Sequence, residues 1–440
     1  MNNYIVEKGT KICVNKELIK SSYNFISDLI KLKKSIDVLF SKFLSKNEFD
    51  DIENTAFYIF LNKDDDEQIT LSLARYIDYG MKFEFNRKKE KELDDLFNDF
   101  IFLYNNINSK LTFQVNYEKM LSDRFLKSLL SINIEPEKAF ISKFGKVCDA
   151  GFGKTISGMI KDIEANKAEN DEYKLTASKG SPNGIEFNVK LLTDYFWNIK
   201  NIYSPKIEIP SFLKFCIDDY ENYFLNKIPQ KKLIWCFGYS KLKIQYLYLK
   251  DQNISISTLP QVLTLLLLEK YEKLNLKQLS ELLKWDLNLN LLKFELSGLI
   301  FNPSFNDDYK SDKGIILADI DQEKKELKDN TEISINKELI ISKKEFNTLP
   351  KGKKKLEAIT ECKMITERYQ DNIIQSTIVR ILKERIGKET SDNYLQIRLH
   401  QKIDLFKPYI NQIQKNIENL IEKSCIRRNG IFYEYIPNYY

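Results

Sequence analysis

The apolar positions between residues 16 and 165 recur at helical spacing. Four long stretches carry the pattern, beginning near Ser21, Thr70, Glu92 and Phe113. Apolar residues at i, i+3, i+4 and i+7 place one stripe on one face of a helix, and several such helices bury their stripes against each other. The pattern therefore predicts an antiparallel helical bundle over residues 16–165.

The hydrophobic period changes to two after residues 178–183. Apolar and polar residues alternate through 242–248, and the chain turns at 251–253 into a second alternating run. The same alternation marks an earlier set of residues: Ile185, Phe187, Val189 and Leu191. Alternation of this kind is typical of strands with one buried face. We expect residues 166–260 to form an α/β region with a mainly antiparallel sheet.

Two further regions follow in the sequence. Residues 262–301 show a helix-turn-helix-like pattern, and the charged stretch 306–330 is predicted to be a loop or a partly disordered insertion. Residues 334–346 are expected to add a strand pair. From residue 365 there are three helical segments and then two strand-like runs around Asn429-Gly430, a pair suited to a tight hairpin turn. Three helices followed by a hairpin predict a winged helix in residues 365–440, and the fold class as a whole is α+β, mostly α.

Composition and charge narrow the function. The 440 residues carry a net charge of +5, from 68 Lys and Arg against 63 Asp and Glu. The basic excess lies toward the C-terminus, where Lys415, Lys423, Arg427 and Arg428 could contact phosphates if the winged helix bound nucleic acid. The balanced charge elsewhere gives no extended basic face, so nucleic-acid binding is the less favoured hypothesis.

Membrane insertion, a resident metal and catalysis are not indicated. The longest apolar run, 262–268, is too short to cross a bilayer, and no signal is visible at the N-terminus. Six cysteines lie without a C-x-x-C pair and His400 is the single histidine, which argues against a zinc site of the chain's own and fits the cytoplasm or nucleus. No cluster of nucleophile, base and acid is apparent, and we expect a non-catalytic protein without a cofactor.

The segment 150–155, A-G-F-G-K-T, resembles a phosphate-binding loop only in part. Such a loop would need glycine where Cys148 stands, and no strand precedes the segment to direct it toward a phosphate. We therefore predict that the segment belongs to a helix.

A helix is also predicted at 374–383, I-Q-S-T-I-V-R-I-L-K. Its apolar stripe is Ile374, Ile378, Ile381, Leu382 and Ile386. Lys383 falls to the side of this stripe and is expected to face water. Taken alone, this is an ordinary amphipathic helix with a solvated lysine.

Several motifs together resemble the cullin family. I-V-R-I-L-K at 378–383, F-K-P at 406–408, I-Q-K-N-I-E-N-L-I-E-K at 413–423 and Y-E-Y-I-P at 433–437 resemble the C-terminal neddylation domain of the cullins. The resemblance continues through L-A-R-Y-x-D at 73–78, F-x-x-x-Y-x-K-M-L-x-x-R at 113–124, Trp197, and K-L-I-W at 232–235. It extends from about residue 17 to residue 437 and places a first winged helix, with its charged loop, in residues 261–364.

The resemblance implies a scaffold subunit of a cullin-RING ubiquitin ligase. A RING-type zinc protein would add a strand to the cullin sheet, and the zinc would belong to that partner, which recruits a ubiquitin-conjugating enzyme. The sheet residues expected at this interface are Ile185, Phe187, Val189, Leu191, Leu233 and Trp235. A ubiquitin-like modifier would join Lys383 through an isopeptide bond. We also expect this chain to lack the long N-terminal arm of helical repeats with which cullins bind substrate adaptors.

Overall fold

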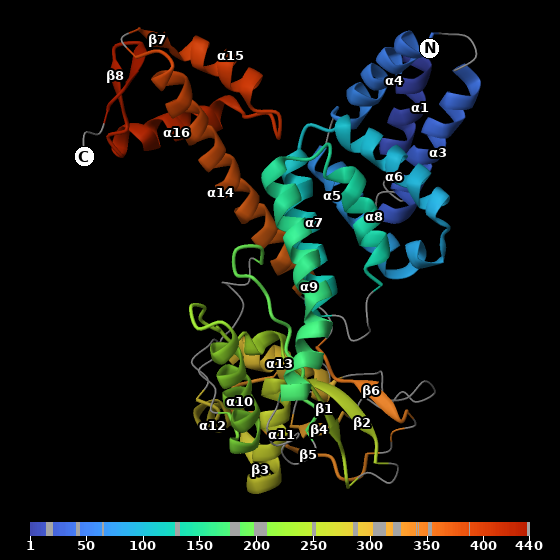
Figure 1. Cartoon of the computed structure of the whole chain (residues 1–440), viewed down its shortest axis with the longest axis vertical. Helices are drawn as coiled ribbons and strands as arrows, with labels where there is room; N and C mark the ends of the chain where they lie inside the picture. The colour runs from blue at the N-terminus through green and yellow to red at the C-terminus, as the bar shows by residue number, and fades with distance from the viewer. Residues whose placement is uncertain are drawn as a thin grey trace. The chain divides into compact units, whose positions relative to one another are not determined.

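The computed structural model divides the chain into two units, residues 1–161 with 355–440, and residues 162–354 (Figure 1). It describes residues 1–14, 21–40, 45–63, 66–127, 133–176, 185–197, 209–248, 252–284, 289–301, 314–319, 327–339, 341, 343–350, 354–386 and 388–437. Helices dominate and the sheets are small, which confirms the predicted α+β, mostly α class. None of the helices in these ranges combines the length and apolar character that crossing a bilayer requires.

The N-terminal part is helical, as predicted. Its helices are α1 (Asn2–Val14), α3 (Ser22–Phe40), α4 (Lys46–Leu61), α5 (Asp66–Tyr79), α6 (Glu90–Asn105), α7 (Lys110–Lys127), α8 (Glu135–Phe144) and α9 (Ala150–Thr176). Helix α1 packs against α3 and α4 and buries Ile5. The packed helices therefore begin upstream of residue 16, where the pattern placed their start.

Motif residues of the bundle meet in a buried ionic cluster. The Arg124 guanidinium donates to Asp78 Oδ1 at 2.6 Å through Nη1 and to Glu137 Oε1 at 2.9 Å through Nε. The Tyr117 hydroxyl donates to Glu137 Oε2 at 2.9 Å. A charge buried this deeply requires partners, so the tyrosine, arginine and aspartate of the two bundle motifs are explained by packing rather than by chemistry.

The A-G-F-G-K-T segment forms the start of helix α9, which confirms the predicted helix. Asp149 Oδ2 accepts hydrogen bonds from the backbone N–H groups of Gly151 at 2.9 Å and Phe152 at 3.2 Å. A carboxylate in this place satisfies the first free N–H groups of a helix and suits its positive end.

The described residues of the second unit form two small sheets. Its elements after α9 are α10 (Ser211–Lys227), β1 (Lys241–Gln245), β2 (Ile254–Thr258), α11 (Leu259–Tyr271), β3 (Lys273–Asn275), α12 (Leu276–Leu282), α13 (Leu289–Ile300), β4 (Ile316–Ala318), β5 (Glu332–Ile335) and β6 (Glu345–Asn347). The predicted antiparallel pairing of 242–248 with the run after 253 is confirmed in β1 and β2, and β6 adds parallel to β2.

Two predictions for this unit are wrong. Strands β5 and β6 do not pair with each other, because they belong to different sheets, of order β3-β5-β4 and β1-β2-β6. The stretch 306–330 is not a loop throughout, since β4 lies within it and pairs with β5. Its remaining part falls largely outside the described residues.

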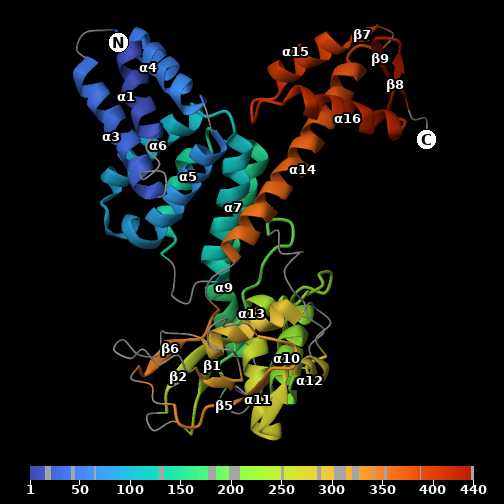
Figure 2. The ribbon, with the colours of Figure 1, turned by 180° about the vertical axis from the view of Figure 1, so that it is seen from behind.

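The C-terminal module follows the order helix, strand, helix, helix, strand, strand. Its elements are α14 (Lys354–Lys383), β7 (Thr390–Ser391), α15 (Asp392–Lys402), α16 (Ile410–Glu422), β8 (Ile426–Asn429) and β9 (Phe432–Tyr435) (Figure 2). Gly430 takes a φ of +61° in the β8–β9 turn, as predicted, but Asn429 does not have a positive φ. Asn429 pairs with Phe432 in the ladder, so the turn residues are Gly430 and Ile431 and the predicted turn is displaced by one residue. The elements from α11 to β5 follow each other in the same order of helices and strands. In the sheets β3-β5-β4 and β7-β9-β8, the strand that comes last in the sequence lies in the centre. This is the connectivity expected of winged helices.

One residue of the predicted α14 stripe is placed differently. Ile374, Ile378, Ile381 and Leu382 are buried as expected. The helix ends at Lys383, however, and the chain turns, so Ile386 leaves the stripe and is 66% exposed.

Candidate functional site

Residues 185–193 form an extended segment that belongs to none of the sheets formed by the described residues. The side chains of Ile185, Phe187, Val189 and Leu191 are half-buried, and those between them are exposed, as the alternating pattern predicted. The structure nevertheless assigns no strand here, so the prediction that these residues are part of a sheet is wrong for the chain as it stands.

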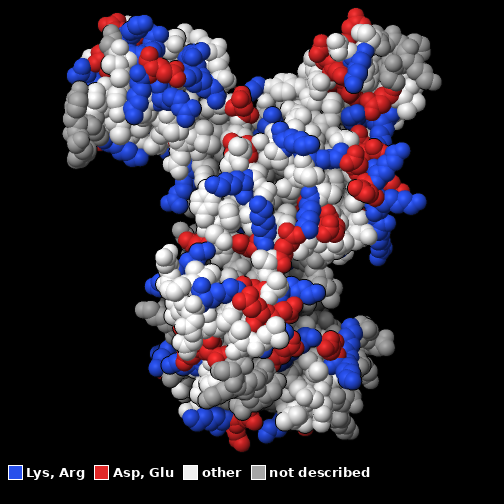
Figure 3. Space-filling view, viewed as in Figure 1, with Lys and Arg blue, Asp and Glu red and all other residues white. Residues whose placement is uncertain are grey.

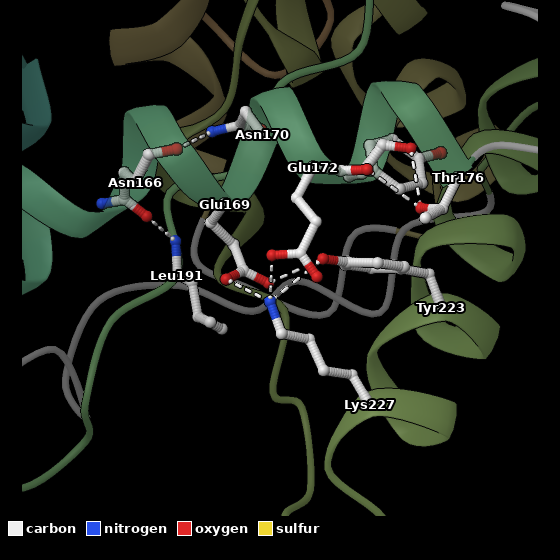
Figure 4. Close-up of polar contacts among 9 residues, drawn as sticks. Asn166, Glu169, Asn170, Glu172, Thr176, Leu191, Tyr223 and Lys227 are labelled. Carbon is white, nitrogen blue, oxygen red and sulfur yellow. Dashed lines mark hydrogen bonds and ion pairs between the residues drawn. The ribbon is translucent and has the colours of Figure 1, made fainter.

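A stripe of polar side chains on α9 binds this segment in place of a neighbouring strand. Asn170 accepts from the Val189 N–H at 2.7 Å and donates to the Val189 carbonyl oxygen at 2.8 Å. Asn166 Oδ1 accepts from the Leu191 N–H at 2.6 Å (Figure 4). Asp162 Oδ2 accepts from the Thr193 N–H at 2.7 Å.

The geometry of an extended chain makes this anchoring one-sided. The N–H groups of residues 189, 191 and 193 and the carbonyl oxygen of Val189 point toward α9, and in an extended chain the backbone groups of the intervening residues point to the opposite edge. Because three helical side chains occupy one edge, the other is the edge at which a further strand could pair.

A second extended segment, residues 232–236, lies beside the first. Leu233 and Trp235 pack with Phe187 against an aromatic cluster formed by α9 and α10, whereas Ile234 is 71% exposed. The Phe187 and Trp235 rings are 6.3 Å apart, and the Trp235 Nε1 donates to Glu221 Oε1 at 2.6 Å. The structure thus brings five of the six residues predicted for the partner interface onto one helical support, namely Phe187, Val189, Leu191, Leu233 and Trp235. Ile185, the sixth, lies at the start of the first segment and is not part of this cluster.

Ionic contacts hold α9 and α10 together beneath these segments. The Lys227 ammonium donates to Glu169 at 2.9 Å, to Glu172 at 2.8 Å and to the Tyr223 hydroxyl at 3.2 Å (Figure 4). The hydrogen bond from Lys227 lowers the pKa of Glu172, and the bonds to Glu172 and Glu169 raise the pKa of Lys227. Both shifts favour the ion pair of Glu172 with Lys227, so this pair is strongest between the titration ranges of the Glu172 carboxylate and the Lys227 amine.

Lys383 is the last residue of α14 and is exposed, as predicted. Its Nζ lies 4.8 Å from the centre of the Tyr435 ring on β9. The carboxylate next to it in sequence, Glu384, is bound by Lys402 at 2.6 and 2.8 Å. The amine is therefore at the surface of the module and is not neutralised by its neighbour Glu384.

The basic residues considered for phosphate binding all have partners. Lys415 pairs with Asp371 at 2.9 Å, Arg427 with Glu434 at 2.7 Å and Arg428 with Glu418 at 2.6 Å. Lys423 donates to Gln375 at 3.1 Å. On the face shown in Figure 3, Lys and Arg are interspersed with Asp and Glu over most of the surface, and Lys and Arg predominate over the C-terminal module at the upper left. Three of these four cations are thus paired with carboxylates. No group of three or more potential metal ligands occurs in the described ranges.

The α9 stripe of Asp162, Asn166 and Asn170 was not predicted from the sequence. Its signal is the spacing of four between consecutive members, which puts three hydrogen-bonding side chains on one face of a helix. Three polar residues on a charged helix are ordinarily solvated, so the spacing alone does not show that they bind a backbone.

The order of these parts is that of a modular α+β protein: a helical domain, an α/β region and two modules with winged-helix connectivity. Residues 1–170 match the cullin alpha solenoid domain, and residues 191–339 match the cullin alpha+beta domain. The chain belongs to the cullin family. The first match begins at residue 1 and so includes α1.

Individual cullins align with most of the chain. It is 27% identical to Cullin-1 of Dictyostelium discoideum over 81% of this chain and 45% of that protein. It is 25% identical to Cullin-4A of Mus musculus over 97% of this chain and 54% of that protein. The chain thus spans about half the length of the curated relatives it matches.

Proposed function

We propose that the chain is a non-catalytic scaffold in a cullin-RING ubiquitin ligase. In this role it binds a RING-type zinc protein through the extended segments on α9 and α10, and it accepts a ubiquitin-like modifier on Lys383. The observation that carries the proposal is the segment 185–193, which α9 anchors along one edge only. The zinc and the contact with the ubiquitin-conjugating enzyme belong to the RING partner.

An added strand is the partner chemistry that fits this edge. Main-chain groups of a peptide can pair with the backbone of residues 188 and 192, and the peptide's apolar side chains can extend the surface formed by Phe187 and Trp235. The anchoring by Asn166 and Asn170 holds the segment extended before the partner arrives, which lowers the ordering cost of binding.

A proline substitution at the open edge tests this interface. Asn188→Pro removes an N–H that points away from α9, so we expect weaker binding of the RING protein by the folded variant. Asn188→Ala is the matched control, because it removes the same side chain and keeps the N–H. Equal binding of both variants, measured by calorimetry, would show that no strand pairs there. Val189→Pro should also weaken binding, through loss of the bond to Asn170.

The acceptor role of Lys383 has its own test. The protein is incubated with the activating and conjugating enzymes of the modifier, and the linkage is mapped by peptide mass spectrometry. We expect one adduct at Lys383, absent in Lys383→Arg and unchanged in Lys388→Arg, which alters another exposed lysine of the module. Modification that persists elsewhere in Lys383→Arg would exclude Lys383 as the acceptor.

Conjugation can act on a contact between the C-terminal module and the bundle. The Leu111 N–H donates to the Leu405 carbonyl oxygen at 3.0 Å, and Phe406 is 3% exposed in a core shared with Leu111 and Val115. The Lys407 ammonium lies 5.0 Å from the Tyr58 ring centre. A bulky modifier on the same module would disfavour this docked arrangement and favour a released one. This shift is how the modification would regulate the ligase.

A further inference from the structure

The ring beneath Lys383 is fixed by the fold of the C-terminal module. Tyr435 stands on β9, where its backbone is in register with Ile426 of β8, and its side chain packs partly into the module core. The next residue, Ile436, donates its N–H to the Cys425 carbonyl oxygen at 3.0 Å. The fold therefore sets the position of the Tyr435 ring, and the contact forms when the flexible Lys383 side chain lies over it.

Other charged groups near Lys383 are engaged elsewhere. Glu384 is bound by Lys402, and the Arg385 guanidinium lies 4.3 Å from the centre of the Tyr394 ring, with its Nε donating to Thr390 at 3.2 Å. Among the residues that the structure describes, Lys383 makes no ion pair. The Tyr435 ring is thus the group that holds the ammonium in place.

We propose that Tyr435 is a positioning residue that restrains Lys383 and slows its conjugation, an inference that rests on Lys383 being the acceptor. In the transfer, the neutral amine attacks the carbonyl carbon of the thioester between the modifier and its conjugating enzyme. A C–N bond forms, the C–S bond breaks, the cysteine thiolate leaves, and the surplus amine proton passes to solvent.

The contact with the ring works against this step. A ring face attracts the ammonium, and this attraction is lost when the amine gives up its charge and turns toward the thioester. An interaction that is stronger in the ground state than in the transition state lowers the rate. An exposed cation–π contact corresponds to about a two- to fivefold effect, and this is the acceleration expected when the ring is removed.

Three variants of the full chain separate the ring from other effects. Tyr435→Leu removes the aromatic face, Tyr435→Phe keeps it without the hydroxyl, and Tyr409→Leu removes an exposed tyrosine, 72% accessible, elsewhere on the module. We expect kcat for conjugation to rise about two- to fivefold in Tyr435→Leu and to stay at the wild-type value in the other two. KM should not change, because the ring does not touch the conjugating enzyme in this proposal.

A spectroscopic signature tests the contact without any enzyme. With ¹³C at the lysine ε carbons, the Lys383 signal, assigned by its loss in Lys383→Arg, should be shifted upfield by the ring in the wild type and in Tyr435→Phe. It should return to the position of a solvated lysine in Tyr435→Leu. This readout remains decisive if Tyr435→Leu fails to fold, since an unshifted signal in the wild type alone would overturn the proposal.

The outcomes distinguish this proposal from the one on which it rests. If Lys383→Arg is still modified, the acceptor assignment fails. If Lys383→Arg is inert while folded Tyr435→Leu is conjugated at the wild-type rate, the acceptor stands and the restraint is refuted. A slower Tyr435→Leu would also refute it, because the ring would then be assisting the transfer.

Discussion

Replacing Asn170 with alanine should loosen the extended segment without unfolding the chain. The side chain makes two hydrogen bonds to Val189, one to its N–H at 2.7 Å and one to its carbonyl oxygen at 2.8 Å. Each such bond contributes about 0.5–1.5 kcal/mol net, so the variant should lose about 1–3 kcal/mol of local stability. Asn166 and Asp162 remain, and they keep Leu191 and Thr193 in place.

Hydrogen exchange measures this loss at one amide. The Val189 N–H should exchange roughly 5- to 150-fold faster in Asn170→Ala, the factor that corresponds to about 1–3 kcal/mol. Asp171→Ala is the matched control, because it changes the next residue of α9, an exposed aspartate. The reasoning is wrong if Val189 exchanges at the same rate in both variants, since Asn170 would then not hold the segment.

The same substitution connects structure and binding. Ordering the segment against an added strand costs more free energy when the free segment is less often extended. The RING protein should therefore bind Asn170→Ala more weakly, and the loss of affinity should be no larger than the increase in the exchange rate of the Val189 N–H. A loss of affinity that exceeds the exchange factor would mean that Asn170 contacts the partner directly.

Three further substitutions test other parts of the structure. Burial raises the pKa of Glu53 to about 7. The native state therefore loses stability as the pH rises from about 4.3, the pKa of the glutamate in the unfolded chain, through 7. Glu53→Gln should raise the melting temperature at pH 8 and have little effect at pH 4. Phe406→Ala should cost about 3–5 kcal/mol in urea unfolding, because it empties a buried site against Leu111. Gly298→Ala should lower the melting temperature measured by calorimetry, since a Cβ there would lie 1.9 Å from the Thr348 carbonyl oxygen.

Elements that depend on local chemistry were predictable from the sequence. The bundle helices follow the apolar period, and Gly430 marks the hairpin through its positive φ, although the turn lies one residue later than the Asn429-Gly430 pair indicated. Lys383 was expected at the surface because it falls beside an apolar stripe, and it is exposed.

Elements that depend on partners distant in the sequence could not be predicted from local patterns. Strand β4 has three residues within a charged stretch and owes its pairing to β5, which a local pattern cannot show. The segment 185–193 has the alternation of a strand, but Asn166 and Asn170 take the backbone groups that a ladder would use. Ile386 matches the helical period, yet α14 ends three residues before it.

The central position of β9 bears on how the C-terminal module folds. Strands β7 and β8 each pair with β9, and β9 follows every other element of the module in the sequence. During synthesis neither β7 nor β8 can form its ladder until residues 432–435 have left the ribosome, so the sheet closes late and in one step. A stop codon that removed only β9 would leave both remaining strands without a partner, and Lys383 would stand on a helix whose module had lost its sheet.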